Sequence, residues 1–354
     1  MQELTIEKVV ARGLGLARLD GRVVFVPGAL PGETLRAEIS HKRKDYLQGS
    51  ICEVTAPHTM RIAPPCRYYG ICGGCDLQHA SYELQLKIKQ DILIDALKRT
   101  GGISLSSIEV TPSPMWGYRR RVRFHQIRDR LGFRKRSSSE VVQVDECMVL
   151  DARLDALLRE QSPEIDLSGS VLAGEHHLGD AGRPAELLLE DSFGHKHLFK
   201  ADGKVFFQSN TAAFAPILDM LNQARNDGGC ALDLFSGVGT FSAFLADRFD
   251  QVIAVERDAG CLAYARENLP SRVQYRSSPV EVWARGAAEQ QINLLVVDPP
   301  RTGIDRKTLK HMLSWRPRQL LSVSCDPVTF ARDLKVMTQS GYRIQDIRGV
   351  DLYP

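Results

Sequence analysis

Residues 230–269 read CALDLFSGVGTFSAFLADRFDQVIAVERDAGCLAYARENL, and this stretch decides the fold class of the second half of the chain. An apolar strand at 231–235 runs into a glycine-containing turn at 236–240, which is followed by a helix. A second apolar strand, at 251–256, ends on an acidic residue, Glu256. Strands that alternate with helices in this way predict a parallel α/β sheet.

The glycine turn has the chemistry of a nucleotide-binding loop. Glycines such as Gly237 let the backbone approach a ligand closely, and the following helix offers free N–H groups. Glu256 can bond the hydroxyls of a ribose. A dinucleotide-binding site usually has a third glycine at the position that Ser242 occupies in this chain. We therefore favour S-adenosylmethionine, which has a ribose but no phosphate, over NAD, and expect Asp233 to receive its amino group.

Two further strands end in polar residues. INLLVVDPPRTG reaches Asp298, and QLLSVSCDP reaches Cys325. Because ligands bind outside the carboxyl ends of strands in open α/β sheets, we expect Glu256, Asp298 and Cys325 in one crevice. Enzymes that methylate exocyclic amines often have an aromatic residue where this chain has Arg301, which disfavours that reaction.

A thiolate at Cys325 would supply chemistry that a methyl donor lacks. Carbon 5 of uracil is a poor nucleophile, but a thiolate that adds to carbon 6 makes carbon 5 electron-rich. Cys325 is therefore a candidate nucleophile, although the adjacent Asp326 does not favour a thiolate. Cys230 and Cys261 fall within a strand and a helix, and we expect them to be small buried hydrophobes.

The first half of the chain has a different pattern. Residues 1–56 contain short alternating strands with Asp-Gly, Gly and Pro turns, which predicts a small β-barrel of a kind that often binds RNA. Residues 57–204 are predicted to form a central β-rich domain that includes helices at 81–99 and 151–160. Residues 205–354 form the α/β domain, on which the helix at 81–99 can also pack.

Three cysteines in one short loop follow a C-x5-C-x2-C pattern: Cys66, Cys72 and Cys75. Tetrahedral metal sites and iron–sulfur clusters usually take four protein ligands. The residues that remain open as the fourth ligand are Cys52, His79 and Cys147. A single C-x2-C is closer to ferredoxin-type ligation than to zinc, although His79 would complete a Cys3His zinc set.

Residues 117–136, GYRRRVRFHQIRDRLGFRKR, carry eight arginines and one lysine against one acidic residue. The alternating apolar residues predict a hairpin with one basic face, which suits RNA phosphates and unpaired bases. A solvated face, or arginines that brace the metal loop, would produce the same pattern. The net charge of the whole chain is only +3, so the charge distribution matters more than its sum.

The composition, with 43% apolar and 25% charged residues, is that of a folded soluble protein. The opening MQELTIEKVV has no apolar leader, and no run approaches the ~18 apolar residues of a membrane span. We therefore expect a cytoplasmic protein, monomeric and without a membrane partner. In that reducing compartment, eight cysteines favour metal binding, catalysis or burial over disulfides.

The combined motifs resemble those of bacterial RNA uracil-5-methyltransferases, which include enzymes that methylate uridine in 23S rRNA and tRNA. The resemblance covers nearly the whole chain and includes a TRAM-type barrel, the loop C-x5-CGGC-x3-H, FFQSN, the glycine turn, DPPRTG and SCDP. It implies an S-adenosylmethionine-dependent Rossmann-like methyltransferase domain with an N-terminal small β-barrel and a central cluster-binding β-rich domain.

The resemblance also implies roles for individual residues. It makes Cys325 the nucleophile toward a flipped-out uridine. The residues implied to contact or frame the donor are Gln208, Phe235, Gly237, Thr240, Glu256 and Asp298. The residues implied to hold a 4Fe-4S cluster are Cys66, Cys72, Cys75 and Cys147.

The expected RNA is 23S rRNA, because some tRNA enzymes of the family lack both barrel and cluster. A tRNA substrate, or a non-catalytic role in RNA binding or maturation, remains an alternative. Family members continue past DLYP into an H-x-E whose glutamate removes the proton from carbon 5, whereas this sequence ends at Pro354. A protein that ended there would be expected to release its covalent RNA adduct slowly.

Overall fold

The structure is a computed structural model, and it describes residues 1–42, 44–161, 165–224, 228–286 and 291–354. The chain divides into two compact units, each assembled from separate stretches of sequence. The first unit contains Met1–Ile92, His125–Cys147 and Pro354, and the second contains Leu93–Phe124 and Met148–Tyr353. Among the described residues, no helix is both long enough and apolar enough to span a bilayer.

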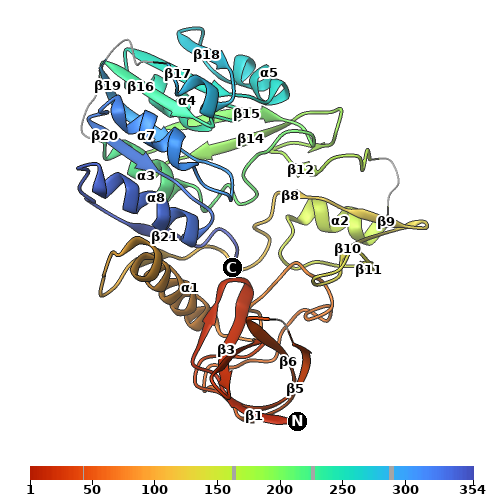
Figure 1. Ribbon diagram of the computed structural model, residues 1–354. Coiled ribbons are helices and arrows are strands. Elements are labelled where there is room, and N and C mark those ends of the chain that lie inside the picture. The colour runs from red at the N-terminus through yellow and green to blue at the C-terminus, as the bar shows by residue number, and fades with distance from the viewer. Residues whose placement is uncertain (43, 162–164, 225–227, 287–290) are drawn as a thin grey trace. The chain divides into compact units, whose positions relative to one another are not determined.

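The first unit begins with a six-stranded sheet in the order β1-β5-β6-β4-β3-β2 (Figure 1). Its strands are β1 Gln2–Thr5, β2 Lys8–Val10, β3 Leu14–Leu19, β4 Arg22–Pro27, β5 Thr34–Lys42 and β6 Tyr46–Ala56. Buried side chains from β1, β3, β4, β5 and β6 share one apolar core, so the sheet curls around it as expected for a small barrel. Asp20 and Gly21 both have positive φ and form the Asp-Gly turn predicted before β4.

Helix α1, Tyr82–Ala96, continues as a π-helical turn, Leu97–Gly101, and confirms the helix predicted at 81–99. The boundary between the two units falls within this helix, after Ile92. The first unit also contains a three-stranded sheet in the order β11-β10-β9. Its strands are β9 His125–Ile127, β10 Arg130–Arg134 and β11 Val141–Gln143.

The basic segment at 117–136 is not one hairpin, and that prediction is wrong. Only β9 and β10 form a hairpin, whereas β8, Arg121–Val122, pairs with β12, Val171–Ala173, in the second unit. The segment therefore leaves one unit and enters the other between Phe124 and His125. Val122 and Phe124 alternate with arginines, and the next apolar residue, Ile127, is one position out of phase with them. This shift does not reveal that β8 pairs with a strand about 50 residues away.

The second unit is built on a five-stranded parallel sheet in the order β18-β17-β16-β19-β20, which confirms the predicted α/β sheet (Figure 1). Its strands are β16 Cys230–Leu234, β17 Gln251–Glu256, β18 Val273–Ser277, β19 Ile292–Val297 and β20 Gln319–Ser322. Its helices are α3 Ala215–Asn222, α4 Thr240–Ala246, α5 Ala259–Asn268, α6 Val280–Trp283, α7 Arg306–Ser314 and α8 Pro327–Gln339. Successive strand residues such as Ala231 and Leu232 belong to different buried clusters, so helices cover both faces of the sheet.

Smaller elements complete both units, including a short 3-10 turn at Ala11–Gly13. The remaining strands are β7 Glu109–Thr111, β12 Val171–Ala173, β13 Leu178–Gly179, β14 Ala185–Glu190, β15 Lys196–Ala201 and β21 Arg348–Val350. Helix α2, Ala152–Glu160, confirms the helix predicted at 151–160. It begins there because the Asp151 carboxylate accepts from the N–H of Arg153 at 3.0 Å and caps the first turn.

Candidate active site

The predicted site residues lie where four neighbouring strands of the second unit end. The strands are parallel, so their carboxyl ends share one edge of the sheet. Along that edge, β17 ends on Glu256, β16 runs into the glycine turn, β19 leads to Asp298 and β20 leads to Cys325. The structure therefore brings the residues predicted from separate motifs to one side of one sheet.

The turn between β16 and α4 depends on two glycines for different reasons. Phe235, Gly237 and Gly239 have positive φ values of 63°, 56° and 92°. A Cβ on Gly239 would lie 2.5 Å from Cδ1 of Leu269, so packing excludes a side chain there. A Cβ on Gly237 would meet nothing within 4 Å, so the space beside it is open to a ligand. Thr240 then begins α4.

Glu256 links the glycine turn to the start of α5. Its Oε2 accepts from the N–H of Gly237 at 3.0 Å. Its Oε1 accepts from the N–H groups of Arg257 at 2.7 Å and Asp258 at 2.8 Å. A carboxylate has roughly four acceptor positions, so Glu256 keeps capacity for a hydroxyl donor such as a ribose.

Asp233 does not have the role expected of it. Its side chain is fully buried within β16, where Oδ2 accepts from the hydroxyl of Ser242 at 2.6 Å. Burial raises the pKa of Asp233 to about 7, against the opposing effect of this hydrogen bond. The prediction that Asp233 meets the donor's amino group is wrong, because the carboxyl has no exposed surface. Ser242, at the third glycine position, is its buried partner.

Asp298 and Gln208 come from two separate segments of the second unit. Asp298 follows β19, and burial raises the pKa of its carboxyl to about 6. Gln208 lies in the segment 205–210, whose backbone at Phe206 hydrogen-bonds the thiol of Cys261 on α5. Since α5 follows Glu256 directly, this contact places the segment beside the acidic end of β17.

Cys325 is exposed between β20 and α8. Asp326 is the N-cap of α8, and its Oδ1 accepts from the N–H groups of Val328 at 3.0 Å and Thr329 at 2.9 Å. The helix N-terminus therefore engages the negative charge next to the candidate nucleophile. Cys230 and Cys261 are buried, as predicted for core cysteines.

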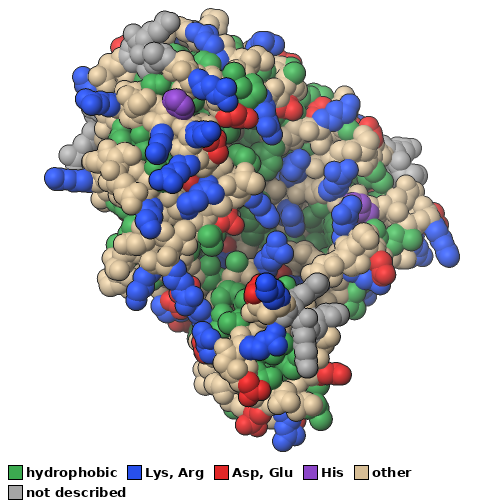
Figure 2. Space-filling model, in the orientation of Figure 1, with side chains coloured by type: hydrophobic (Ala, Val, Ile, Leu, Met, Phe, Trp, Pro, Cys, Tyr) green, Lys and Arg blue, Asp and Glu red, His purple; other side chains and the backbone are tan. Residues whose placement is uncertain are grey.

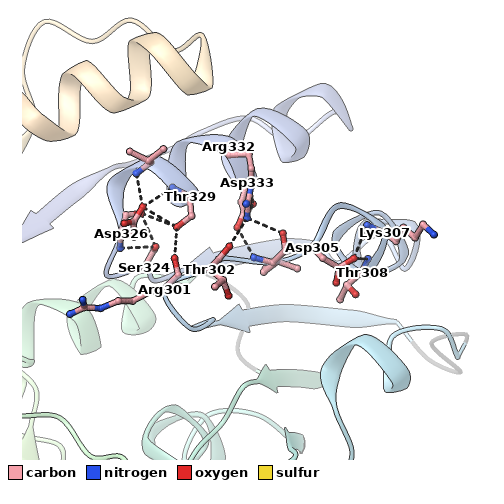
Figure 3. A network of polar contacts seen from close by, with 12 residues as sticks. Arg301, Thr302, Asp305, Lys307, Thr308, Ser324, Asp326, Thr329, Arg332 and Asp333 are labelled. Carbon is pink, nitrogen blue, oxygen red and sulfur yellow. Dashed lines mark hydrogen bonds and ion pairs between the residues drawn. The ribbon is translucent and has the colours of Figure 1, made fainter. Parts of the chain in front are cut away.

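A polar network that joins α8 to the loop between β19 and α7 was not foreseen (Figure 3). Thr329, Arg332 and Asp333 bond this loop from one face of α8. Their i, i+3, i+4 spacing was the one signal available in the sequence.

The cysteine loop, in the first unit, is tied to β10. The N–H of Gly73 donates to the carbonyl of Arg134 at 3.0 Å, and that of Arg136 donates to the carbonyl of Ile71 at 2.9 Å. The Arg136 guanidinium pairs with Asp76 at 2.5 Å and also donates to the carbonyl of Cys75. A Cβ on Gly73 would lie 3.3 Å from the Arg134 carbonyl oxygen, so this close approach favours glycine.

The segment with Cys147 is tied to the same loop. Asp145 accepts from the hydroxyl of Tyr68 at 3.1 Å and from Nη2 of Arg67 at 3.2 Å, two residues that directly follow Cys66. All four cysteines implied as cluster ligands thus fall within the first unit. Among the described residues, no group of three or more His, Cys, Asp or Glu side chains is arranged so that it could hold a metal ion.

The two other candidates for a fourth ligand have different surroundings. His79 is buried, and its Nδ1 is hydrogen-bonded to the hydroxyl of Tyr69 at 2.6 Å. Burial lowers the pKa of His79 to about 4, so this imidazole is neutral. Cys52 is exposed on β6. All eight cysteines lie among the described residues, and none forms a disulfide.

Seven of the eight arginines of the basic segment fall into two groups, and the eighth, Arg136, pairs with Asp76 in the cysteine loop. Within the second unit, Arg120 pairs with Glu175 at 2.5 Å, while Arg119 and Arg121 lie over the rings of Tyr353 and Phe206 at 5.9 and 5.5 Å. These three residues brace the fold. The exposed arginines are Arg123, Arg128, Arg130 and Arg134. Figure 2 shows many basic side chains on the visible face of the molecule.

Comparisons with known proteins identify the family of the chain. Residues 1–52 match the TRAM domain, and residues 287–354 match the tRNA (uracil-5-)-methyltransferase family. The 23S rRNA (uracil(1939)-C(5))-methyltransferase RlmD of Halomonas elongata is 32% identical and aligns with 99% of this chain and 86% of its own. The protein of the same name from Shewanella sp. (strain MR-4) is 30% identical and aligns with 100% of this chain and 93% of its own.

A solved structure has the same fold along the whole chain. The crystal structure of Pyrococcus abyssi tRNA (uracil-54, C5)-methyltransferase in complex with S-adenosyl-L-homocysteine has a TM-score of 0.72 and 22% identity, and the match covers 99% of this chain and 97% of that chain. The fold and the strand-end site define an S-adenosylmethionine-dependent methyltransferase. By its relatives' identity and coverage, the chain belongs to the RNA uracil-5-methyltransferase family.

Proposed function

We propose that the protein transfers a methyl group from S-adenosylmethionine to carbon 5 of a uridine in RNA, with Cys325 as the nucleophile. The observation that carries this proposal is the exposed Cys325 thiol, which follows β20 on the sheet edge that also carries the glycine turn and Glu256. The residues proposed to bind or frame the donor are Gln208, Phe235, Gly237, Thr240, Glu256 and Asp298.

The reaction has three steps. The Cys325 thiolate adds to carbon 6 of the uracil, and the electrons of the carbon 5–carbon 6 double bond move into an enolate. Carbon 5 then attacks the methyl group of the donor, whose bond to sulfur breaks and leaves its electrons on S-adenosylhomocysteine. A base removes the proton from carbon 5, and the electrons of that C–H bond re-form the double bond and expel the thiolate.

Replacement of Cys325 distinguishes this reaction from methylation at another base atom. Cys325→Ala should abolish formation of 5-methyluridine, because no thiolate remains to activate carbon 5. Its affinity for S-adenosylhomocysteine should stay within about twofold of wild type, since the donor loop is intact. Nucleoside mass spectrometry after incubation with RNA and donor checks the product. Methylation that persists in Cys325→Ala would contradict the proposal.

We propose 23S rRNA as the substrate. The support is that the relatives named for this substrate match the chain along its whole length. A tRNA substrate is the second candidate, because the family match at 287–354 and the Pyrococcus abyssi enzyme are named for tRNA. In a deletion strain, loss of 5-methyluridine from 23S rRNA would support the first candidate, and loss from tRNA alone would support the second.

We also propose that Cys66, Cys72, Cys75 and Cys147 hold a 4Fe-4S cluster. The fit is supported by the Tyr68–Asp145 hydrogen bond, which holds the segment before Cys147 beside the loop. A bound cluster would supply a four-thiolate cross-link between loop and segment. Protein purified without oxygen should be brown and contain about four irons per chain. One zinc ion per chain in place of iron would overturn this proposal.

The remaining proposals concern organisation. We take residues 1–56 as an RNA-binding barrel, 57–204 as the central domain and 205–354 as the methyltransferase domain. We propose that the exposed arginines contact RNA phosphates, and that the protein is cytoplasmic and monomeric. Sedimentation analysis of the purified protein tests the monomer, and fractionation of cell extracts tests the compartment.

A further inference from the structure

Two loops carry the proposed chemistry, and one helix contacts both. Asp298 and Arg301 lie in the loop between β19 and α7, while Cys325 directly precedes α8. Figure 3 shows the side chains at 329, 332 and 333 of α8 directed toward the first of these loops. Residues at i, i+3 and i+4 share one face of a helix, so the three side chains act from the same side.

Two of these side chains bond main-chain oxygens of the loop. The hydroxyl of Thr329 lies 3.3 Å from the carbonyl oxygen of Arg301, 3.2 Å from that of Asp326 and 3.3 Å from Asp326 Oδ1, so its one proton is shared between the loop and the cap of α8. Nη2 of Arg332 donates to the carbonyl of Thr302 at 3.1 Å and to that of Ile304 at 3.0 Å. The loop is therefore held through its backbone shortly after Asp298, which is proposed to frame the donor.

Asp333 bonds the same loop from a buried position. Its side chain is 5% exposed and pairs with Arg332 at 2.8 Å. Its Oδ2 also accepts from the N–H of Ile304 at 2.9 Å. Gly303 fits against this pair with a φ of +70°, and a Cβ there would overlap Arg332 and lie 2.8 Å from Asp333 Oδ2. A side chain at 303 would therefore displace the Arg332–Asp333 pair, in addition to the cost of its left-handed backbone.

The same end of α8 also orders the nucleophile. Asp326 caps the helix, and its N–H donates to the hydroxyl of Ser324 at 3.3 Å, so the residues on both sides of Cys325 are bonded to each other. The cap at Asp326 and the three side chains that bond the loop lie within the first two turns of one helix. This short stretch of α8 therefore fixes both the thiol and the Arg301 loop.

We propose that Thr329, Arg332 and Asp333 are positioning residues that set the distance between the Arg301 loop and the Cys325 thiol, and so the rate of attack on uracil. None of the three needs to touch RNA or donor. The inference rests on the proposed function. A misplacement of about 1 Å between reacting groups can cost about 100-fold in rate.

The test uses S-adenosylmethionine and substrate RNA that contains 5-fluorouridine. After thiolate addition and methyl transfer, carbon 5 carries fluorine and methyl but no proton for a base to remove, so the thiolate is not expelled and the covalent adduct accumulates. The rate of adduct formation on a denaturing gel reports positioning, and its final amplitude counts intact sites. Thr329→Val and Arg332→Gln should form adduct about 10- to 100-fold more slowly, with full amplitude. Their Kd for S-adenosylhomocysteine and their KM for RNA should stay within about twofold.

Thr329→Val is the decisive variant, since it removes one hydroxyl and leaves the buried Asp333 charge paired. Thr329→Ser keeps that hydroxyl and should restore the rate to within about twofold of wild type. Asp305→Ala is the matched control, because Asp305 caps α7 at the far end of the same loop. It should unfold more easily yet react at the wild-type rate.

Two results would overturn the inference. One is a wild-type rate in both Thr329→Val and Arg332→Gln. The other is a reduced amplitude with an unchanged rate, which shows that the network only supports the fold. A wild-type protein that binds S-adenosylhomocysteine and RNA but forms no adduct would instead refute the proposed function.

Discussion

At the scale of the residue, Gly237 and Gly239 predict two separable effects. Gly239→Ala should lower the free energy of unfolding by about 2–4 kcal/mol, because the new methyl group meets Leu269 and the backbone is left-handed. Gly237→Ala meets no atom and should cost about 1–2 kcal/mol from the backbone alone. Its methyl group enters the open space, so donor affinity should fall at least tenfold, or about 1.4 kcal/mol.

Urea unfolding and calorimetric titration with S-adenosylhomocysteine measure these two effects. The double variant Gly239→Ala/Leu269→Ala relieves the overlap and serves as the control for packing. Equal losses of stability in Gly237→Ala and Gly239→Ala would contradict the conclusion that only Gly239 is required by packing.

The buried carboxyl of Asp233 predicts a pH-dependent stability. Its folded pKa of about 7 lies above the ordinary value of 3.8 for this carboxyl, so between these values the folded state binds a proton that the unfolded chain releases. The wild type therefore gains stability as the pH falls through this range and bears a buried charge above it. Asp233→Asn should be more stable than wild type at pH ~8, by up to about 4 kcal/mol, and should lose most of this advantage near pH ~4.

Urea unfolding of both proteins at the two pH values checks this prediction. Asp298 titrates in both proteins and its charge also raises the pKa of Asp233, so the change in their difference with pH reports Asp233 together with this coupling. A difference that is the same at both pH values would show that Asp233 does not titrate as described.

At the scale of the element, the link between the cysteine loop and β11 predicts how the proposed cluster is retained. Asp145→Ala keeps all four cysteines but removes the acceptor for Tyr68 and Arg67. The segment with Cys147 should loosen, and a chelator should remove iron about 10-fold faster, as for other residues that support metal ligands.

Iron content and the decay of the absorbance near ~400 nm, typical of iron–sulfur proteins, measure the loss. Glu140→Gln is the matched control, because it removes an exposed ion pair with Lys135 at 2.7 Å in the connection between β10 and β11. Equal rates of iron loss in Asp145→Ala and in this control would exclude a role for Asp145.

The elements that sequence could predict are those whose cause is local. The helix at 151–160 has its cap at Asp151, and the strand that ends on Glu256 has its own apolar run. The partner of β8 is about 50 residues away in sequence, and the contacts of Arg332 are to carbonyl oxygens, which every residue has. The β8–β12 pairing and the bonds of Arg332 leave no local pattern in the sequence. For this reason the sequence predicts a single hairpin at 117–136 and does not predict the polar network of α8.

At the scale of the whole molecule, a net charge of +3 conceals two kinds of arginine. Arg128 and Arg134 are exposed, so each change to glutamine should lower the slope of log K against log salt for RNA binding by about 1. Arg120 pairs with Glu175, so Arg120→Gln should instead lower the free energy of unfolding by about 2–3 kcal/mol.

RNA titrations at several salt concentrations and urea unfolding separate the two effects. Circular dichroism of the Arg128 and Arg134 variants provides the control for folding. An unchanged salt slope in those variants would show that the exposed arginines do not meet phosphates.

The hydrogen bonds from α8 to the loop at 301–304 also bear on which residues of this loop can be replaced. Thr329 and Arg332 donate to carbonyl oxygens of the loop, and Asp333 accepts from a loop N–H. These bonds are to the backbone, so they do not depend on the side chains at Arg301 and Thr302. Both side chains are exposed, and neither is needed to keep the loop in place. Mutations at these two positions can therefore accumulate without displacing the loop backbone. During evolution or design, the side chains that this loop presents to solvent can change while the loop and the nucleophile stay in place.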